Sequence, residues 1–263
     1  MDAARYAPWA VVTGAAQGIG AAFADALASV GLSLLLIDRE PELLAAKAGK
    51  LRATGATVVE SALDLGAAGA ADTLVEAVAD IDVGLFVSNA AVSVVGRFTD
   101  QSLHSKLAQL EVNCRVPLVV IDHLLPRLVA RGSGGIILLS SGSALRGSPL
   151  VAGYAATKAW NLLLAESLWD EVRGDGVDVL AVLPGTTRTP GWLRDDPQPS
   201  LSTASVMEPA DVVGEALAAL GRQPSIVPGQ ANRDAEAFMA GLERAEAVAI
   251  VGQVMRDTYP GRA

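Results

Sequence analysis

The sequence predicts a single α/β domain, built on a doubly wound parallel sheet with helices on both faces and followed by a C-terminal helical extension. Short apolar runs, typical of buried strands, alternate with helical stretches between residues 9 and 227. That alternation favours a parallel sheet covered on both sides. The chain has 263 residues, 51% of them hydrophobic, which suffices for one large core. We therefore expect one domain over residues 1–263, with an N-terminal arm at residues 1–8 and the extension at residues 229–263.

The overall composition argues against several classes of partner. A net charge of −9 and a pI of about 4.7 disfavour nucleic acid and anionic membranes. The single cysteine, Cys114, allows no intrachain disulfide, as is typical of the reducing cytoplasm. We expect no secretory signal in residues 1–8, and no apolar run reaches the ~18–20 residues of a spanning helix. His104 and His123 lack the spacing of metal ligands, so we expect no metal site. The single cysteine suits a cytoplasmic location, which we therefore expect.

The first apolar run, Trp9–Thr13, is a predicted strand that leads into a glycine-rich turn, Thr13–Gly20, and then into a predicted helix, Ala21–Val30. This order forms a cradle for a pyrophosphate, because glycines let the backbone come close and the helix N-terminus offers free N–H groups. The glycines could instead serve only to make a tight turn. The residues expected to contact a cofactor here are Gly14, Gln17, Gly18, Ile19 and Gly20.

A second apolar run, Leu32–Ile37, is closed by Asp38 and Arg39. An acidic side chain about twenty residues after the glycines is placed to accept hydrogen bonds from a ribose 2′-hydroxyl. Asp38 would also repel a 2′-phosphate, whereas Arg39 could pair with one. We judge the effect of Asp38 to be stronger, so the expected cofactor is NAD rather than NADP. Alternatively, Asp38 only supplies negative charge to the N-terminus of the helix that begins near Pro41.

The rest of the chain continues the alternation. Predicted strands cover Thr57–Glu60, Val83–Val87, Gly135–Ser140, Val177–Leu183 and Ser225–Val227. Predicted helices cover Glu42–Ala53, Ala67–Ala79, Leu103–Arg131, the Tyr154 helix as far as Val172, Pro209–Leu220 and Asn232–Asp257. In the longest of these an interruption is expected at Asn113–Pro117, since proline removes a helix hydrogen bond. The polar segment Gly191–Met207 is expected to be a mobile loop.

Tyr154 and Lys158 are four residues apart, so on a helix their side chains share one face, with Cβ atoms ~5–6 Å apart. A free tyrosine has a pKa near ~10 and is a poor base at neutral pH. A neighbouring cation stabilises the phenolate and lowers that pKa, which would give a proton carrier suited to neutral pH. Alone, such a pair usually only shares a half-solvated helix face. The hypothesis therefore depends on the motifs that precede it.

Taken in order, the motifs resemble those of the short-chain dehydrogenase/reductase family. They are Thr-Gly-x-x-x-Gly-x-Gly at Thr13–Gly20, Asp64, Asn89-Ala90-Ala91, Asn113, Ser141, Tyr154-x-x-x-Lys158 and Pro184-Gly185. The resemblance covers about Trp9 to Val227, and it implies a Rossmann-type sheet that binds a nicotinamide dinucleotide. Ala91 stands where the family usually has glycine, and some thirty-five residues follow Val227 where many members end.

The resemblance implies a role for each matching residue. Tyr154 would be the acid/base, and Lys158 would hold the nicotinamide ribose and lower the pKa of the tyrosine. Ser141 would hydrogen-bond the substrate oxygen, with Ser143 as the fallback. Asn113 would hold a water that links Lys158 to solvent. Further cofactor contacts are expected from Asp64 to the adenine, Asn89 to the adenosine side, Thr189 to the carboxamide, and from Leu65, Ala90, Pro184, Gly185 and Thr187.

In this family the substrate pocket lies above the nicotinamide, between the loops after the fourth, fifth and sixth strands. Here those loops carry mostly apolar side chains, which favours a secondary alcohol or ketone with a bulky apolar body, such as a terpenoid, steroid or aryl-alkyl alcohol. Arg188 and Arg194 could bind an acid, but solvated loop charges are the simpler interpretation. The expected substrate contacts are Ser143, Leu145, Val151, Trp192 and Met207, with Val92, Val94, Leu150 and Leu193 nearby.

The function implied is that of an NAD-dependent alcohol dehydrogenase or ketone reductase, acting by direct hydride transfer. Two alternatives stay open: a non-enzymatic NAD(P)-binding sensor on the same fold, and an isomerase or dehydratase that uses the same tyrosine. We expect a homodimer or a homotetramer. The extension has apolar pairs at helical spacing, and we expect them to pack on the body or on a second subunit: Phe238 with Leu242, and Val251 with Met255.

Overall fold

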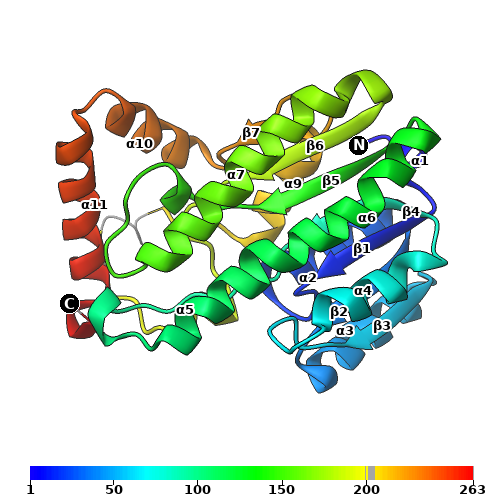
Figure 1. Ribbon diagram of the computed structural model, residues 1–263, viewed down its shortest axis with the longest axis horizontal. Helices are drawn as coiled ribbons and strands as arrows, with labels where there is room; N and C mark the ends of the chain where they lie inside the picture. Colours follow the sequence, from blue (N-terminus) through cyan, green and yellow to red (C-terminus); the bar gives the residue numbers. More distant parts are fainter. Residues whose placement is uncertain (199, 201–204, 263) are drawn as a thin grey trace.

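In the part of the chain that the structure describes, residues 1–198, 200 and 205–262, seven parallel strands form one sheet (Figure 1). In this computed structural model the strands are β1 (Trp9–Thr13), β2 (Ser33–Asp38), β3 (Val58–Ala62), β4 (Val83–Ser88), β5 (Gly134–Leu139), β6 (Val177–Val182) and β7 (Ser225–Ile226). Their order is β3-β2-β1-β4-β5-β6-β7, so the direction of strand addition reverses between β1 and β4. The predicted doubly wound sheet is confirmed, and ligands bind beyond the strands' carboxyl ends at such a reversal.

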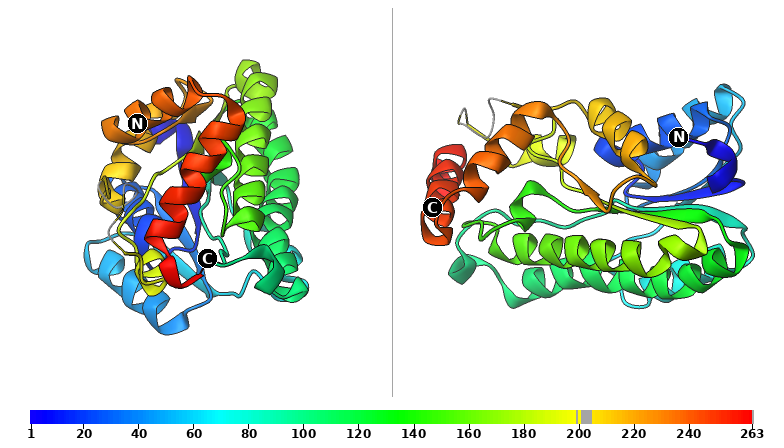
Figure 2. Two further views of the ribbon diagram at one scale, coloured as in Figure 1. Left: turned by 90° about the vertical axis from the view of Figure 1, so that its left-hand side faces the viewer. Right: turned by 90° about the horizontal axis from the view of Figure 1, so that it is seen from above.

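Helices cover both faces of the sheet, as the view from above in Figure 2 shows. One face carries α2 (Gly18–Ser29), α3 (Pro41–Ala53) and α9 (Pro209–Ala219). The other carries α4 (Ala70–Ala79), α6 (Val116–Arg131) and α7 (Ala152–Val172). Successive strand residues point to opposite faces, so Val12 belongs to the first core and Val11 to the second. Because both faces are buried in the middle of the sheet, the inner strands β1, β4 and β5 are almost continuously buried, whereas the edge strand β3 is partly exposed.

Two differences from the predicted bounds have a clear physical reason. Helix α2 begins at Gly18 and not at Ala21, because the last part of the glycine-rich turn already forms the first helical turn. The N-terminal arm is not irregular, since it contains the short helix α1 (Ala3–Tyr6). The Nε of Arg5 lies 2.5 Å from Oδ2 of Asp178, and the hydroxyl of Tyr6 donates to the same oxygen at 2.7 Å. These bonds fix the arm to β6 at the end of the sheet opposite the site described below.

The long helical region contains a wide turn that the sequence analysis placed slightly too late. Helix α5 (Leu103–Leu110) passes into a π-helical turn, Glu111–Arg115, which continues directly into α6. Pro117 lies in the first turn of α6. Because Pro117 has no N–H, it cannot donate to the carbonyl of Asn113 four residues earlier, and this carbonyl accepts from Asn161 Nδ2 at 3.1 Å. The interruption therefore consists of a π turn followed by proline, and proline alone does not account for it.

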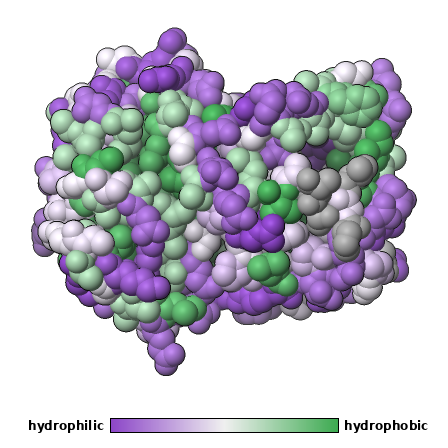
Figure 3. All heavy atoms as spheres, turned by 180° about the vertical axis from the view of Figure 1, so that it is seen from behind, coloured by the Kyte–Doolittle hydropathy of each residue, from purple (hydrophilic) through white to green (hydrophobic). Residues whose placement is uncertain are grey.

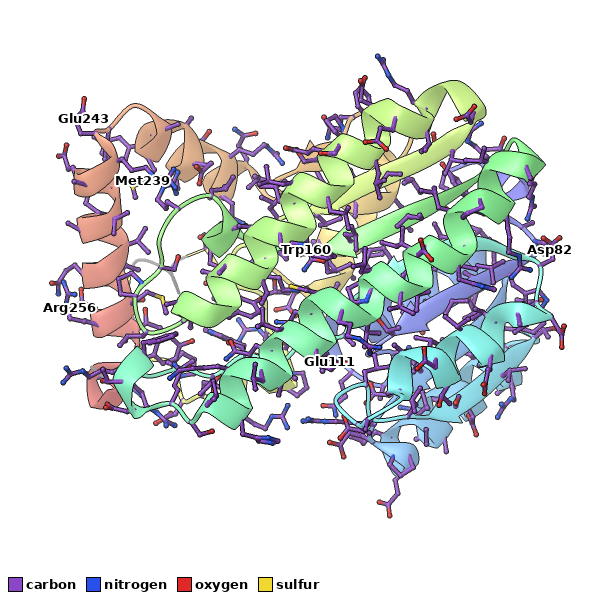
Figure 4. The ribbon with its side chains drawn as sticks, viewed as in Figure 1. Asp82, Glu111, Trp160, Met239, Glu243 and Arg256 are labelled. Carbon is purple, nitrogen blue, oxygen red and sulfur yellow. The ribbon has the colours of Figure 1, made fainter. Side chains whose placement is uncertain are left out.

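The C-terminal extension forms two helices, α10 (Gln230–Ala240) and α11 (Arg244–Thr258), where the sequence predicted one. They meet at a corner marked by Glu243 in Figure 4. Arg146, in the loop after β5, forms a two-pronged ion pair with Glu236. Met255 packs on a buried cluster of the body, as expected, whereas Phe238 is 63% exposed, so its packing on a second subunit stays a prediction.

The segment Gly191–Met207 is not loop throughout, since α8 (Pro190–Arg194) forms at its start. Residues 199 and 201–204, on which the predicted mobile loop also falls, lie outside the described residues. On the face shown in Figure 3, hydrophobic and hydrophilic residues are interspersed in small patches. Among the described residues, no helix combines the length and the apolar character needed to cross a membrane. Nor does any group of three His, Cys, Asp or Glu in those residues form a potential metal site.

Candidate active site

The turn between β1 and α2 requires glycine at two positions with positive φ. Gly14 has a φ of 66° and Gly18 a φ of 59°. A Cβ on Gly14 would lie 2.7 Å from Asn89 Nδ2, and a Cβ on Gly18 would lie 3.0 Å from Thr189 Cγ2. Both the backbone conformation and the limited space therefore exclude a side chain, and the backbone of the turn is left free to approach a ligand closely.

Asn89, at the end of β4, ties the neighbouring strand to this turn. Its Nδ2 donates to the carbonyl of Thr13 at 2.9 Å and to that of Gly14 at 3.0 Å. The backbone N–H groups of Asn89 and Ala90 both donate to Thr13 Oγ1, at 3.0 and 3.1 Å. Gly20 is buried, and a Cβ there would collide with the Gly14 carbonyl. Gly20 therefore packs directly behind the turn, and its contact with a cofactor stays a prediction.

A cleft of about 310 Å³ opens where β1, β2 and β4 end. Most of the predicted cofactor residues line it: Gly14, Gln17, Gly18, Ile19, Asp38, Arg39, Asp64, Leu65, Asn89, Ala90 and Thr189. Sequence reasoning did not assign several other lining residues to the cofactor, namely Glu40, Leu63, Val112, Pro190, Gly191 and Arg194. Three of these belong to α8, which was expected to be loop. The signal that could have found them is the Thr189-Pro190 pair, a helix N-cap followed by proline in the first turn.

The acidic side chains at one end of the cleft are held by backbone N–H groups. Asp38 Oδ2 accepts from Ala16 N at 2.9 Å, and its Oδ1 accepts from Glu40 N at 3.1 Å. Asp64 Oδ1 accepts from the N–H of Gly66 at 2.9 Å. In the described part of the chain, the partner of Arg39 is Glu40, in an exposed ion pair with 3.5 Å between Arg39 Nε and Glu40 Oε1. The carboxylate of Asp38 is therefore fixed in the cleft wall, whereas Arg39 is free to move at its rim.

Three predicted cofactor residues after β6 do not line this cleft. The carbonyl of Pro184 accepts from Gly142 N at 3.0 Å. A Cβ on Gly185 would lie 2.6 Å from Asn232 Oδ1, and Thr187 is buried with its hydroxyl donating to the Gly185 carbonyl at 3.1 Å. In this structure they shape the connection from β6 to Thr189, which does line the cleft.

Ser141, Tyr154 and Lys158 come together as their spacing predicts. Ser141 caps the short turn Gly142–Ala144, and its Oγ accepts from the N–H of Ser143 at 3.2 Å and from the Ser143 hydroxyl at 3.0 Å. Helix α7 carries the other two. Lys158 Nζ lies 5.5 Å from the centre of the Tyr154 ring and donates to the carbonyl of Leu139 at 2.5 Å. Both Ser141 and Ser143 therefore stand next to a phenol and an ammonium group at the end of β5.

Burial controls the ionisation of both α7 groups. It raises the pKa of Tyr154, and a hydrogen bond with Ser141 acts in the opposite direction. It lowers the pKa of Lys158 to about 8, against the opposite influence of Cys114. The expected lowering of the Tyr154 pKa by Lys158 is thus wrong for this arrangement, because desolvation dominates and the ammonium is directed at the Leu139 carbonyl.

Asn113, in the π-helical turn, has its whole side chain engaged. Its Oδ1 accepts from Val92 N at 2.8 Å, and its Nδ2 donates to the Val92 carbonyl and to Thr157 Oγ1, both at 2.9 Å. Asn113 therefore holds the loop after β4 against α7, immediately beside Lys158. That Asn113 binds a water linking Lys158 to solvent stays a prediction.

A small apolar cluster lies against Tyr154. Val95, Leu150, Val151 and Tyr259 are buried together, and Tyr154 and Met255 pack on them. Met255 and Tyr259 come from the extension, about a hundred residues along the chain from Tyr154. Sequence reasoning missed both as neighbours of the site, because periodicity shows which face of a helix is apolar but not where that face docks.

The predicted substrate residues do not all meet at this cluster. Val151 belongs to it, and Trp192 reaches it through a hydrogen bond to Tyr259. Leu145 packs on the core beneath α6 and α7, whereas Met207 packs on the opposite core beneath α2 and α9. Val151 is thus the expected substrate residue that belongs to the buried cluster, and the substrate contacts of the other residues stay a prediction.

Comparison with known proteins places the chain in a family. The sequence profile of the family described as short chain dehydrogenase matches residues 8–198. The chain belongs to this family, and it is an oxidoreductase of the short-chain dehydrogenase/reductase type. It is similar to a 7beta-hydroxysteroid dehydrogenase from Collinsella aerofaciens, with 30% identity over 258 residues that cover 96% of this chain and 98% of the relative.

Solved structures agree with this assignment. A structure from a study of 7beta-hydroxysteroid dehydrogenase stereoselectivity superposes with a TM-score of 0.88 at 29% identity, covering 94% of this chain and 98% of the other. A bulky-bulky ketone specific alcohol dehydrogenase from Comamonas testosteroni gives a TM-score of 0.76 at 26% identity, covering 91% and 96%. A short-chain dehydrogenase from Sphingobium yanoikuyae, 28% identical with a TM-score of 0.77 and coverage of 91% and 98%, is in complex with NADPH.

The family's fold binds NAD or NADP, and the residues present fit such a group. The turn at Gly14 and Gly18 has no space for side chains, as a closely approaching pyrophosphate requires. The adjoining cleft ends at the fixed carboxylate of Asp38. The glycine turn would hold the phosphates and Asp38 the adenosine ribose. Ser141 and Tyr154 stand at the other side, where a substrate oxygen would be bound.

Proposed function

We propose that the protein is an NAD-dependent oxidoreductase that interconverts a secondary alcohol and its ketone on a bulky apolar substrate. The observation that carries this proposal is the grouping of Ser141, Tyr154 and Lys158 at the end of β5, beside a glycine-lined cleft. A bound nicotinamide supplies the hydride chemistry. The chain's own residues would then orient the substrate and move one proton, with Ser141 bonding the substrate oxygen and Tyr154 exchanging the proton at it.

The preference for NAD follows from Asp38. Each of its carboxylate oxygens already accepts a backbone N–H, so the group cannot turn away from the cleft without losing bonds. A 2′-phosphate placed there would meet a fixed negative charge, whereas a 2′-hydroxyl can donate to it. Arg39 is the opposing influence, but it is exposed and already near Glu40. We therefore expect kcat/KM with NAD to exceed that with NADP, and a preference for NADP would contradict this reading of Asp38.

The substrate class follows from the surroundings of Tyr154. The cluster around its ring is formed by aliphatic and aromatic side chains, Val95, Leu150, Val151, Met255 and Tyr259. Such surroundings favour apolar burial, worth ~0.8 kcal/mol per CH₂, and leave the polar groups of a sugar unpaired. The similarity to a hydroxysteroid dehydrogenase supports a steroid-sized secondary alcohol.

The test is steady-state kinetics on a homologous series of secondary alcohols, extended to steroid alcohols, with NAD and with NADP. We expect kcat/KM to rise with added carbons until the pocket is full. A clear preference for sugars or hydroxy acids would contradict the proposed substrate. NADH binding without turnover of any alcohol would favour the sensor, and turnover without a change in reduced cofactor would favour the isomerase or dehydratase.

We also propose that the protein forms a homo-oligomer. Four leucines on the outer side of α5, α6 and α7 are 47% to 63% exposed: Leu107, Leu110, Leu118 and Leu163. Burial of these side chains against a second copy would remove apolar surface from water. Sedimentation at several concentrations should give a dimer or tetramer mass, and a monomer mass throughout would refute the proposal.

A further inference from the structure

Helix α8 brings a basic side chain into the cofactor cleft. Arg194, the last residue of α8, lines the same cleft as Gly14, Gly18 and Asp38. The sequence analysis considered Arg194 only as a solvated loop charge or a partner for an acidic substrate. Its position on the cofactor side suggests a third role.

The contacts of α8 locate this side chain more closely. Thr189, the N-cap of α8, packs on the turn, since a Cβ on Gly18 would lie 3.0 Å from Thr189 Cγ2. The guanidinium of Arg194 folds back toward the start of its own helix, because a Cβ on Gly191 would lie 3.7 Å from Arg194 Nη2 and 4.0 Å from Thr189 Oγ1. Arg194 thus lies on the wall of the cleft, on a short helix that begins beside the glycine-rich turn.

The charges along the cleft are distributed unevenly. Asp38, Glu40 and Asp64 line it as acids, and Arg39 and Arg194 line it as bases. Arg39 follows Asp38 directly and stands near Glu40, at the end where the ribose of the adenosine would lie. The glycine turn offers backbone N–H groups but no basic side chain, since Gln17 occupies its centre. Arg194 is therefore the cation positioned for the two negative charges of a pyrophosphate.

Arg188 provides an internal comparison, because it lies in the same connection but its charge is already paired. Its Nε lies 2.7 Å from Glu208 Oε1. Among the described residues, the side chain of Arg194 forms neither a hydrogen bond nor an ion pair within 4.0 Å; its acidic neighbour Asp195 interacts with it only at longer range. Within residues 1–198, 200 and 205–262, the guanidinium of Arg194 therefore has no charged partner, whereas that of Arg188 is paired with Glu208.

We infer that Arg194 binds the pyrophosphate of the bound dinucleotide and thereby fastens α8 over the glycine-rich turn. The inference rests on the proposed dinucleotide binding and adds a residue to it. Helix α8 also carries Trp192, which forms a hydrogen bond with Tyr259 beside Tyr154. The contact between Arg194 and the pyrophosphate would therefore link the phosphate end of the cleft, through α8, to the wall of the substrate side.

The test is calorimetric titration of the full-length wild type and of the variants Arg194→Ala, Arg194→Lys and Arg188→Ala. Three ligands are compared: NADH, ADP-ribose, which keeps the pyrophosphate, and adenosine, which lacks it. We expect Arg194→Ala to weaken NADH and ADP-ribose about tenfold, the size of one charge-assisted contact. Adenosine should be unaffected, Arg194→Lys should retain part of the affinity, and Arg188→Ala should match the wild type. The difference should shrink in high salt.

Several results would overturn the inference. The first is that Arg194→Ala binds ADP-ribose as tightly as the wild type does. The second is that Arg194→Ala loses as much affinity for adenosine as for ADP-ribose, which would indicate a disturbed fold. An unchanged ADP-ribose affinity with a raised KM for a carboxylate-bearing substrate would assign Arg194 to the substrate. If the wild type binds neither NADH nor ADP-ribose, the proposed function fails first. The two failures are therefore distinguishable.

Discussion

The two sides of the site are built in different ways. The cofactor side is built around backbone: the turn at Gly14 and Gly18, and the ends of β2 and β4, where Asp38 and Asn89 lie. These central parts lie within a few residues of a strand, and Val112 and α8 complete the wall. The substrate side is made of side chains from distant segments, and Tyr259 and Val95 meet there although they are far apart in the sequence. A binding site formed mainly by backbone groups tolerates few residue types, glycine above all. A binding site formed by side chains can change its substrate specificity by substitution without disturbing the sheet.

The largest effect is expected from a change at Tyr154, which should strongly lower turnover while leaving cofactor binding intact. Tyr154→Phe removes the hydroxyl that would exchange the proton and leaves the glycine-lined cleft intact. We expect kcat to fall by ~10²–10⁴-fold, the range of general acid–base help. NADH binding, followed by fluorescence, should persist. Turnover close to that of the wild type would remove Tyr154 from its proposed role, and loss of NADH binding would show that the sides are not separable.

The next prediction concerns the free energy of unfolding and how far the burial of Lys158 reduces it. Burial lowers the pKa of this lysine from 10.5 to about 8, so between these values the unfolded chain binds a proton that the folded chain does not. The stability of the wild type should therefore rise with pH across this window, relative to Lys158→Met, and the full penalty applies below pH 8. At ~1.36 kcal/mol per pKa unit, the difference should change by about 3 kcal/mol.

Urea unfolding of both proteins without cofactor, at pH 7 and at pH 10.5, measures this quantity. Titrating groups that do not interact with Lys158 are common to both proteins and cancel in the difference. Cys114 does interact with Lys158, so both proteins also carry Cys114→Ala. Parallel stability curves for wild type and Lys158→Met would show that the lysine is not destabilised by burial.

A backbone substitution tests the cofactor side directly. Gly14→Ala places a methyl group at a φ of 66° and against Asn89. Left-handed backbone costs an ordinary residue roughly 1–2 kcal/mol, so NADH affinity should fall at least about tenfold as the turn shifts. The matched control is Gly49→Ala in α3, where a Cβ meets nothing within 4 Å. That variant should bind NADH like the wild type. Unchanged affinity in Gly14→Ala would argue against a backbone-made cradle.

The smallest expected effect concerns the long-range contacts of the substrate side. Glu236→Gln removes the partner of Arg146, whose side chain is only 10% exposed. We expect the free energy of unfolding to fall by about 1 kcal/mol, between the values for exposed and buried pairs. KM for the apolar substrate should rise while the Kd for NADH stays constant. Glu246→Gln, an exposed change on α11, is the control. If the two variants behave alike, the ion pair does not hold the extension in place.

The same contrast explains how far the sequence could lead. Gly14 and Asp38 could be located because both follow strands whose carboxyl ends share one edge of the sheet, and Ser141 and Tyr154 because their motifs resemble those of the family. The position of Tyr259 could not, since it depends on how α11 docks. The direction of the Tyr154 pKa shift was also missed, because spacing reveals a neighbouring charge but not the loss of water around both groups.

The wide turn at Glu111–Arg115 makes the function sensitive to chain length at one place. A π-helical bond joins residues five apart and not four, so this turn holds one residue more than an α-helix would. Deleting that residue would narrow the turn, and Pro117 would still lack an N–H for α-helical bonding. The side chains within the turn would then be displaced, and Asn113 would lose its bonds to Val92 and Thr157. An insertion or deletion of one residue in this segment is therefore a larger change than most substitutions.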